Sequence, residues 1–579
     1  MELSHLIVDA VWRPSFVLKY HELRDHLNPH SGRIGPPSWD RSFLNPRNRV
    51  DTLDTTLSRW RIDGATICGT CLFVVPLDLL PDLPPLRILL YIADQTELSP
   101  ALRHGLDACV GVPLRDPKAI SRLGLAKHLC RALDHHCAQS PGFLDRYLKL
   151  PFGSRLIFED ITPDVADMRL EVERDYSVES KMETLQFLRQ SWSDVSPDAW
   201  PPAVDVYDLR LVRQLNDSVS LVEMPGKSLA IFKAASVSLH HTYHELHFLL
   251  TCPPHPNVMP RPLAIVTKKS AFGAKRGVIG FLLRHFESGS LRDILPARQR
   301  GGTLPNSLKL RWCRQVASAL AHLHIGGSFY SDLRPDNVLL DSEENAILCD
   351  FEQRGNWYEW CAPEILYRQY AENIRARLPD RAVNSPFDGL LKGFAHSHTL
   401  SASACYTPAE NPIEARNRAW FALPPIAQEK AVVYSLGLFV YAVFEGLSNV
   451  QRNIANQFPI EPDVEFPTMR RTPNSIKNII QRCTSDVPDW ETTDLRSELS
   501  RVIRVDGLLF PETRTDLPHG TQATFETVMA SFLKFWRTEL ARAEKFLELP
   551  EWETGNYGQN RPSLREVVDA LESLSEDLN

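Results

Sequence analysis

Short runs of apolar residues separated by polar turns dominate the chain from about residue 206 to residue 286. Three of these runs, at 209–215, 219–223 and 228–233, are joined by an Asn-Asp-Ser turn and a Met-Pro-Gly-Lys turn, which predicts short strands. Residues 240–250 change to helical spacing, and the apolar run at 278–286 predicts another strand. We therefore expect a small β-rich unit that contains one helix.

Helical spacing takes over after this unit. Apolar residues recur on one side of 307–324, and the run at 432–444 is apolar on every side, which predicts a buried helix. Another helical pattern follows at 476–483. The last one opens with a capping box from Ser563 to Glu566. The second unit should therefore be mainly helical.

Two stretches interrupt the helical unit. Residues 371–428 are irregular, and residues 484–560 form a further expansion that includes a predicted helix at 522–547. Both are interpreted as insertions.

The patterns in residues 1–195 are weaker and indicate a mixed α/β region. Cysteine and histidine residues there raise one chemical alternative, a zinc site, but a single Cys-x-x-Cys in an apolar strand is more typical of a protein core. No function can be read from this region. The predicted elements are strands at 66–76 and 86–93, helices at 118–136 and 178–193, and a proline-rich linker or domain boundary at 196–202. The alternative zinc ligands are Cys68 and Cys71 with His128, Cys130, His135 or Cys137.

Composition adds few constraints. The 579 residues predict two or three domains, and 43% hydrophobic with 23% charged residues is ordinary for a globular protein. A net charge of −8 gives no reason to expect nucleic acid or an anionic membrane as a partner. The first 16 residues lack the pattern of a signal peptide, and no apolar run approaches the length of a membrane span. We therefore expect a cytoplasmic protein, the nucleus remaining open, with its 11 cysteines mostly reduced.

Candidate chemistry gathers around one predicted hairpin. Asp332 and Asn337 come just before its first strand, at 338–340, and Asp350 comes just after its second strand, at 346–348. Three oxygen-bearing side chains at one end of a small sheet suit a hard cation such as Mg²⁺. They also leave one carboxylate to orient an attacking hydroxyl group.

The order Asp332, four residues, Asn337, a hairpin and Asp350-Phe351 resembles the catalytic loop and metal-binding segment of eukaryotic protein kinases. The resemblance implies that Asp332 accepts or orients the proton of the acceptor hydroxyl. It also implies that Asn337 and Asp350 hold Mg²⁺ and that Arg334 stabilises the transferring charge.

Upstream motifs follow the same family order. Leu-Ala-Ile-Phe-Lys at 229–233 resembles the strand whose lysine contacts the ATP phosphates, so Lys233 would hold ATP and pair with Glu245 of the next helix. The alternative for Glu245 is an ordinary solvated helix residue. The remaining residues that the resemblance implies for the nucleotide site are Ala230, Leu283 at its gate, Arg284, His285 and Phe286 in the hinge, and Leu339.

Downstream, Ala362-Pro363-Glu364 resembles the end of the kinase activation segment, and Arg561-Pro-Ser resembles the last kinase subdomain. An Arg561–Glu364 salt bridge is therefore predicted. The resemblance implies an α+β, bilobal protein kinase-like fold for 206–579. Its lobes would be a small one at about 206–286 and a large one at about 287–579, preceded by the region 1–195.

Several residues depart from the family pattern. No glycine occurs between Leu209 and Pro225, so the nucleotide lid should be weaker or differently shaped. The segment from Asp350 to Glu364 spans only 15 residues, which is short for a platform that binds an extended peptide. Tyr330 and Ser331 replace the usual His and Arg, and the loss of that arginine argues against a phosphorylation switch. The other departures are Arg334 for Lys, Glu352 for Gly and Val432 for Asp.

Three functional hypotheses remain open from the sequence. The first is a divergent ATP- and Mg²⁺-dependent protein kinase acting on a protein hydroxyl, Ser or Thr. The second is a pseudokinase scaffold that binds nucleotide or a partner protein with little turnover. The third is a kinase of small molecules. Fold-level resemblance alone does not separate them.

Overall fold

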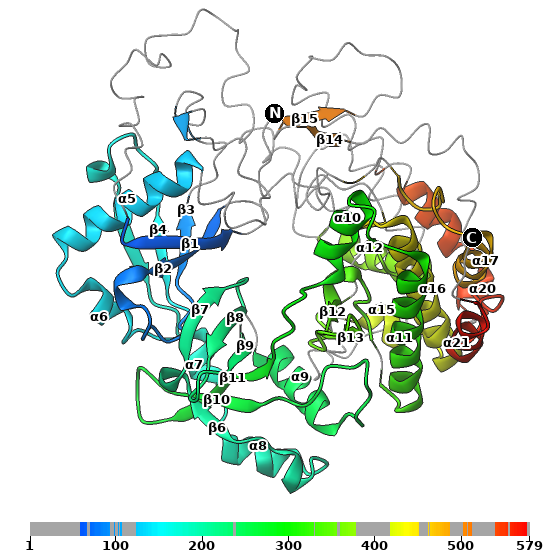
Figure 1. Cartoon of the computed structure of the whole chain (residues 1–579), viewed down its shortest axis with the longest axis horizontal. Helices are drawn as coiled ribbons and strands as arrows, with labels where there is room; N and C mark the ends of the chain where they lie inside the picture. Colours follow the sequence, from blue (N-terminus) through cyan, green and yellow to red (C-terminus); the bar gives the residue numbers. More distant parts are fainter. Residues whose placement is uncertain are drawn as a thin grey trace, which may run out of the picture.

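The computed structural model describes most of the chain between residues 58 and 575 (Figure 1). Cys68, the first 57 residues and the middle of both predicted insertions lie outside the described part. The described residues are 58–65, 70–92, 98, 102, 105–106, 123–235, 239–328, 330–355, 359–377, 417–450, 461, 464–486, 502–505, 508–511, 536, 539–553 and 556–575.

The N-terminal region contains a five-stranded sheet whose strand order follows the sequence. Strands β3 and β4 are parallel, and the long connection between them contains helix α5, which packs on the sheet. This confirms the prediction of mixed α and β structure. The elements are β1 (Trp60–Ala65), β2 (Cys71–Pro76), β3 (Leu89–Ile92), α5 (Gly124–Gln139), α6 (Phe143–Tyr147), β4 (Arg155–Phe158) and β5 (Leu170–Glu173).

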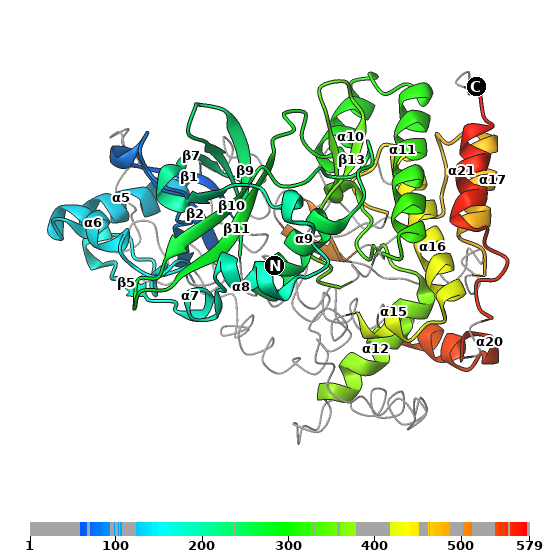
Figure 2. The ribbon, with the colours of Figure 1, turned by 90° about the horizontal axis from the view of Figure 1, so that it is seen from below.

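A six-stranded sheet with the order β6-β10-β11-β9-β8-β7 forms the small lobe. Its strands are antiparallel except for β6, which pairs in parallel with β10. Helix α9 lies between this sheet and the helical lobe (Figure 2). The elements are β6 (Ala203–Asp205), β7 (Arg210–Gln214), β8 (Val219–Glu223), β9 (Leu229–Ala234), α9 (Leu239–Thr251), β10 (Ala264–Lys269) and β11 (Arg276–Arg284).

The predicted helix at 178–193 is wrong in one respect, because two helices occupy this stretch, α7 (Ser177–Lys181) and α8 (Leu185–Ser191). The chain breaks at Met182, which has an extended backbone and is fully buried in the core of the small lobe. The Thr184 side chain then caps α8 by accepting a hydrogen bond from the Phe187 N–H.

The stretch 196–202 is not a free linker, which corrects one of the two alternatives predicted for it, a linker or a domain boundary. Val195 and Ala199 are buried in the same core as Leu246 of α9, and Trp192 stacks on Trp200 with ring centroids 5.6 Å apart. Residues 177–205 therefore pack with the small lobe, and the division of the chain into domains stays a prediction.

The large lobe is mainly helical and carries two short hairpins (Figure 1). The predicted capping box of its last helix is present, with Ser563 and Glu566 hydrogen-bonded reciprocally. Its elements are α10 (Leu291–Arg300), α11 (Asn306–Ile325), β12 (Val338–Leu340), β13 (Ala346–Leu348), α12 (Pro363–Arg377), α15 (Arg418–Phe421), α16 (Pro425–Glu445), α17 (Asn474–Cys483), β14 (Val502–Val505), β15 (Leu508–Pro511), α20 (Pro550–Glu553) and α21 (Leu564–Glu572).

Helix α16 runs through the core of the large lobe, as its uniformly apolar pattern predicted. Its residues from Leu436 to Glu445 are all buried. By length and composition this helix could also cross a membrane, which corrects the expectation that no apolar run approaches the length of a membrane span. However, 67% of its most apolar window is buried in the protein. A core helix needs apolar residues on all sides, so burial accounts for the composition.

The structure describes the ends of the first predicted insertion and several segments of the second. Helix α12 continues through Arg377, and α15 and the start of α16 precede residue 428. In the second insertion, residues 539–547 are helical, in agreement with the prediction for 522–547 where the chain is described.

Candidate active site

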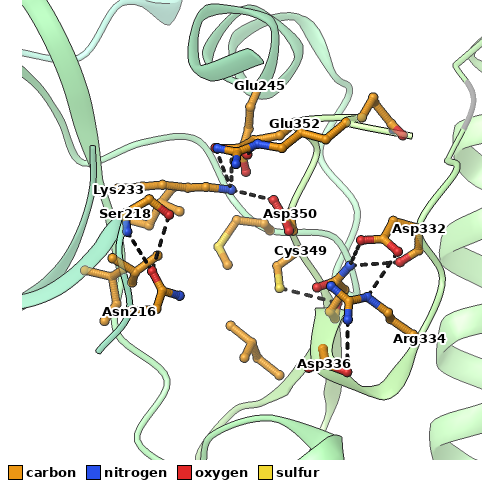
Figure 3. A pocket seen from close by; sticks show the side chains of 18 of the residues that line it. Asn216, Ser218, Lys233, Glu245, Asp332, Arg334, Asp336, Cys349, Asp350 and Glu352 are labelled. Carbon is orange, nitrogen blue, oxygen red and sulfur yellow. Dashed lines mark hydrogen bonds and ion pairs between the residues drawn. The ribbon is translucent and has the colours of Figure 1, made fainter. Parts of the chain in front are cut away.

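A cavity of about 540 Å³ lies between the six-stranded sheet and the large lobe. A volume of this size suits a small-molecule ligand or cofactor. The β7–β8 turn, β9, α9 and β11 line it from the small lobe, and the segments 332–339 and 349–355 line it from the large lobe (Figure 3). The cavity therefore draws residues from across the chain.

Lys233 is the polar centre of the small-lobe wall. Residues of a strand alternate between its two faces, so Ile231 and Lys233 of β9 both face the cavity. The Lys233 Nζ lies 2.5 Å from Glu245 Oε2 on α9, 2.5 Å from Asp350 Oδ1 and 3.6 Å from Glu352 Oε1. The ion pair expected between Lys233 and Glu245 is therefore present.

Burial and charge act against each other in this group. Burial would lower the pKa of Lys233, but Asp350, Glu245 and Glu352 outweigh it and hold the pKa well above its usual value. Burial raises the pKa of Glu245 to about 7 despite the adjacent ammonium. Burial would also raise the pKa of Asp350, but the charge of Lys233 prevails and lowers it. Asp350 is thus a firmly ionised carboxylate.

The catalytic-loop residues predicted from the sequence lie together on the large-lobe wall (Figure 3). The Asn337 Nδ2 donates hydrogen bonds to the Asp332 main-chain oxygen at 2.8 Å and to its Oδ2 at 2.9 Å. The Arg334 Nε donates to Asp332 Oδ1 at 3.1 Å. Asn337 and Arg334 therefore hold the Asp332 carboxylate in one orientation.

Asp332 is also desolvated. Burial raises the pKa of its carboxyl group, while the charge of Arg334 and the hydrogen bond from Asn337 oppose the rise. Such a carboxylate is a stronger base than a solvated aspartate. The arrangement is suited to general-base chemistry or to orienting a hydroxyl proton.

The segment after β13 is anchored by aromatic contacts. Asp350 has a left-handed backbone with φ of 64°, and Phe351 is fully buried. The Phe351 ring stacks on Phe248 of α9, with centroids 4.3 Å apart, and meets the Tyr330 ring edge-on at 5.4 Å. The Tyr330 hydroxyl donates a hydrogen bond to the Cys349 oxygen at 2.5 Å. Tyr330 thus ties the catalytic loop to the segment that carries Asp350.

Ser331 and Glu352, two of the departures from the family pattern, also have defined partners. The Ser331 hydroxyl donates to Gln353 Oε1 at 2.6 Å. Glu352 is buried and pairs with Arg354 as well as with Lys233. These residues stabilise the start of the segment 350–364 through contacts that the family pattern does not contain.

Most of the residues predicted for the site line the cavity. One correction concerns Ala230, which lies on the opposite face of β9 and is buried in the small-lobe core. His285 and Phe286 do not line the described cavity either. Phe286 belongs to the core that α9 shares with the large lobe. The predicted residues that line the cavity are Lys233, Glu245, Leu283, Arg284, Asp332, Arg334, Asn337, Leu339 and Asp350.

Several lining residues were missed. Ile231 could have been found from strand alternation, because it lies two positions before Lys233. Cys349 directly precedes Asp350 and could have been found from that position. Met259 carries no such local signal, since its place depends on packing between distant segments. The turn at 216–219 also lines the cavity, although it lacks the glycines of the family loop.

The donor set fits Mg²⁺ and a nucleotide. The described lining contains six carboxylates and four cationic side chains, so it carries an excess of negative charge. Asp350 and Asn337 offer the hard oxygen atoms that Mg²⁺ prefers. Ile231, Met259, Leu283 and Leu339 supply apolar wall for a flat ring, while Lys233 offers a cation for phosphate.

The zinc alternative in the N-terminal region finds no support among the described residues. Cys71 is buried in β2, and the His128 Nε2 lies 2.7 Å from the Thr162 oxygen. In the described part of the chain, the one group of residues spaced to hold a metal ion is Glu245, Asp350 and Glu352, around Lys233.

The predicted Arg561–Glu364 salt bridge is present and buried. Arg561 Nη1 and Nη2 lie 2.6 Å and 3.2 Å from the two Glu364 oxygens. The Arg561 Nε donates to the Ser485 oxygen at 3.0 Å, and the guanidinium lies over the Tyr434 ring. This pair fixes the start of α12 to the segment before α21, and both belong to the large lobe.

Comparison with known proteins agrees with this geometry. Residues 222–373 match the family model of the protein kinase domain. A stretch of 97 residues is 32% identical to CBL-interacting serine/threonine-protein kinase 16 of Arabidopsis thaliana, over 17% of this chain and 18% of that protein. A stretch of 157 residues is 30% identical to Serine/threonine-protein kinase UCN of Arabidopsis thaliana, over 26% of this chain and 37% of that protein.

A third relative is Serine/threonine-protein kinase Sgk1 of Xenopus tropicalis, 38% identical over 71 residues, which is 10% of this chain and 17% of that protein. The chain thus aligns with no more than 37% of the length of these relatives. The family match ends at residue 373. Beyond it, the Arg561–Glu364 pair links the C-terminal helices to the matched region.

Proposed function

Because the chain carries a protein kinase-like domain, we propose that it is a divergent ATP-dependent kinase that transfers the γ-phosphate of ATP to a serine or threonine hydroxyl of a protein. The observation that carries this proposal is the convergence of two groups on one cavity. Lys233, paired with Glu245, comes from the small lobe. Asp332, oriented by Asn337 and Arg334, comes from the large lobe.

The side chains divide the work as follows. Leu283, Leu339 and Ile231 enclose the base of the nucleotide, and Lys233 binds its phosphates. Asp332 accepts a hydrogen bond from the acceptor hydroxyl and takes its proton as the new P–O bond forms. The bond between the γ-phosphorus and the bridging oxygen breaks at the same time, and ADP leaves with that oxygen. Arg334, held beside Asp332, stabilises negative charge on the transferring group. Asn337 and Asp350 would hold Mg²⁺, which neutralises phosphate charge when bound.

The experiment that tests this proposal measures both binding and transfer. Wild-type protein with Mg·ATP should show a rise in melting temperature and should phosphorylate generic protein acceptors on Ser or Thr. Lys233→Met should abolish both, because it removes the cation that faces the phosphates. Lys269→Met, which removes an exposed lysine at the end of β10, is the matched control and should behave as wild type.

Absence of any nucleotide-dependent stabilisation in the wild-type protein would overturn the proposal. So would stabilisation that persists unchanged in Lys233→Met. Transfer to small hydroxylated molecules but to no protein acceptor would instead support a small-molecule kinase.

One observation favours a second candidate, a pseudokinase scaffold. Glu352 stands where the family has glycine, and it adds a third carboxylate near Lys233. Phosphates must compete with these carboxylates for the ammonium. Nucleotide-dependent stabilisation without detectable transfer to any acceptor would support the scaffold.

A further inference from the structure

The turn that covers the cavity is rigidly built. Residues 216–219 line the cavity between β7 and β8, and no glycine loosens them. The Asn216 side chain accepts a hydrogen bond from the Ser218 N–H at 2.8 Å, and the Gln214 side chain donates to the Asn216 oxygen at 2.5 Å. These hydrogen bonds fix the shape of the turn. Its distance from the cavity floor is then set by the contacts that the turn makes with the rest of the protein.

Arg87 of the N-terminal region reaches this turn from outside the small lobe. Its Nη1 donates to the Asp217 main-chain oxygen at 3.1 Å and to the Ala235 main-chain oxygen at 2.8 Å. Ala235 follows β9 and lies two residues after Lys233. One buried guanidinium thus connects the lid turn to the strand that carries Lys233.

The surroundings of Arg87 are shaped for this contact. Its backbone is left-handed, with φ of 57°, a conformation that costs energy for a residue other than glycine. The guanidinium carbon lies 5.1 Å from the Phe152 ring centroid. A Cβ at Gly153 would come within 2.8 Å of Arg87 Nη2, so glycine there makes room for it. The neighbouring Leu86 is buried in the small-lobe core.

The N-terminal region also holds β7, the strand that leads into the lid turn, through β1 and through Leu83. Asp63 Oδ2 accepts a hydrogen bond from the Gln214 N–H at 2.8 Å, and Arg61 Nη2 donates to the Val212 oxygen at 2.9 Å. The Leu211 N–H donates to the Leu83 oxygen at 2.7 Å. Figure 1 shows the N-terminal strands beside β7 and β8. Both the strand and the turn of the lid are therefore anchored outside the small lobe.

We infer that Arg87, in the segment just before β3, is a positioning residue for nucleotide binding, through which the N-terminal region sets the height of the lid turn above Lys233. This inference rests on the proposed function. Arg87 acts through the main-chain oxygens of Asp217 and Ala235 and does not itself touch the nucleotide. In a lid without glycines, rigid support replaces the close backbone approach that glycine allows.

The test compares Arg87→Ala and Arg87→Lys with Arg155→Ala in the full chain. Arg155 lies on β4 of the same sheet, is half-exposed and pairs with Glu173 and Asp175, so it controls for general damage to the sheet. Arg87→Ala should speed amide hydrogen exchange at residues 214–220. It should also raise the KM for ATP about tenfold while kcat changes less than about twofold, because charged hydrogen bonds that position the turn are lost.

Arg87→Lys keeps the charge and one donor group, so both effects should be partly rescued, and this variant also serves if Arg87→Ala fails to fold. Unchanged exchange at 214–220, or an unchanged KM for ATP in a folded Arg87 variant, would overturn this inference alone. A wild-type chain that neither binds nor turns over ATP would overturn the proposed function as well. Equal effects in Arg155→Ala would show that the Arg87 variants act through general damage to the N-terminal sheet, and would also overturn the inference.

Discussion

At the residue scale, this cavity has one more carboxylate around Lys233 than the kinase pattern would place there. Glu245 and Asp350 stand where the phosphoryl-transfer sites of protein kinases have the two acidic residues that they require. Glu352 adds a third, and its burial is tolerated because Arg354 neutralises it from the other side. The extra carboxylate competes with a phosphate for the Lys233 ammonium. Cation binding should therefore matter more here for nucleotide affinity than in a site with glycine at this position.

The raised pKa of Asp332 predicts a pH dependence. The base must be ionised, so kcat should fall as the pH drops through a pKa that lies above the ordinary aspartate value. Because the charge of Arg334 opposes this rise, Arg334→Gln should move the acidic limb to higher pH as well as lowering kcat. The measurement is kcat at saturating Mg·ATP from about pH 5 to pH 8. An acidic limb that stays in place in Arg334→Gln would contradict the assignment of Asp332.

Sequence spacing pointed to polar residues that lie together in one cavity, because Lys233, Asp332, Asn337 and Asp350 belong to segments whose order is distinctive. It failed for Ala230, where the two-residue period of a strand puts Ile231, not Ala230, on the cavity side. The placement of Met259 depends on packing between segments, which no local pattern encodes.

At the element scale, the apolar periods predicted most strands and helices, but not where a helix must break. Met182 fits the helical spacing of 178–193, yet it is needed in the small-lobe core, and the chain turns there to bury it. Burial on both faces explains the compact apolar runs of the N-terminal region. Strand β2 is buried on both faces because α5 covers one and Leu83 and Leu211 cover part of the other.

The Arg561–Glu364 pair should be a major element-to-element link. Glu364→Gln would leave a buried guanidinium without its counter-charge, at a cost of about 3–5 kcal/mol. The melting temperature should therefore fall by roughly 3–4 °C in a chain of this size. In the control, Glu183→Gln removes one partner of the exposed Lys275–Glu183 pair, which is worth at most about 1 kcal/mol. Similar shifts in the two variants would show that the buried pair has no special role.

At the scale of the whole molecule, the N-terminal sheet, the small lobe and the large lobe follow one another in a connected series (Figure 2). The cavity lies between the two lobes. Sequence patterns predicted the content of each part and the protein kinase-like region that the family model matches at 222–373. They could not predict that the N-terminal sheet supports the lid, because periodicity shows that a face is buried but not which segment covers it. Arg87 therefore carried no signal in the sequence.

The central claim is that Asp332 serves phosphoryl transfer in this cavity. The most direct measurement is the initial rate of phosphate transfer from Mg·ATP by wild type, Asp332→Asn and the control Asp341→Asn, which makes the same charge change in the β12–β13 turn. We predict that Asp332→Asn lowers the rate by about 10²–10⁴-fold while nucleotide-dependent stabilisation is retained, and that Asp341→Asn keeps a near wild-type rate. Transfer that survives in Asp332→Asn would contradict the mechanism.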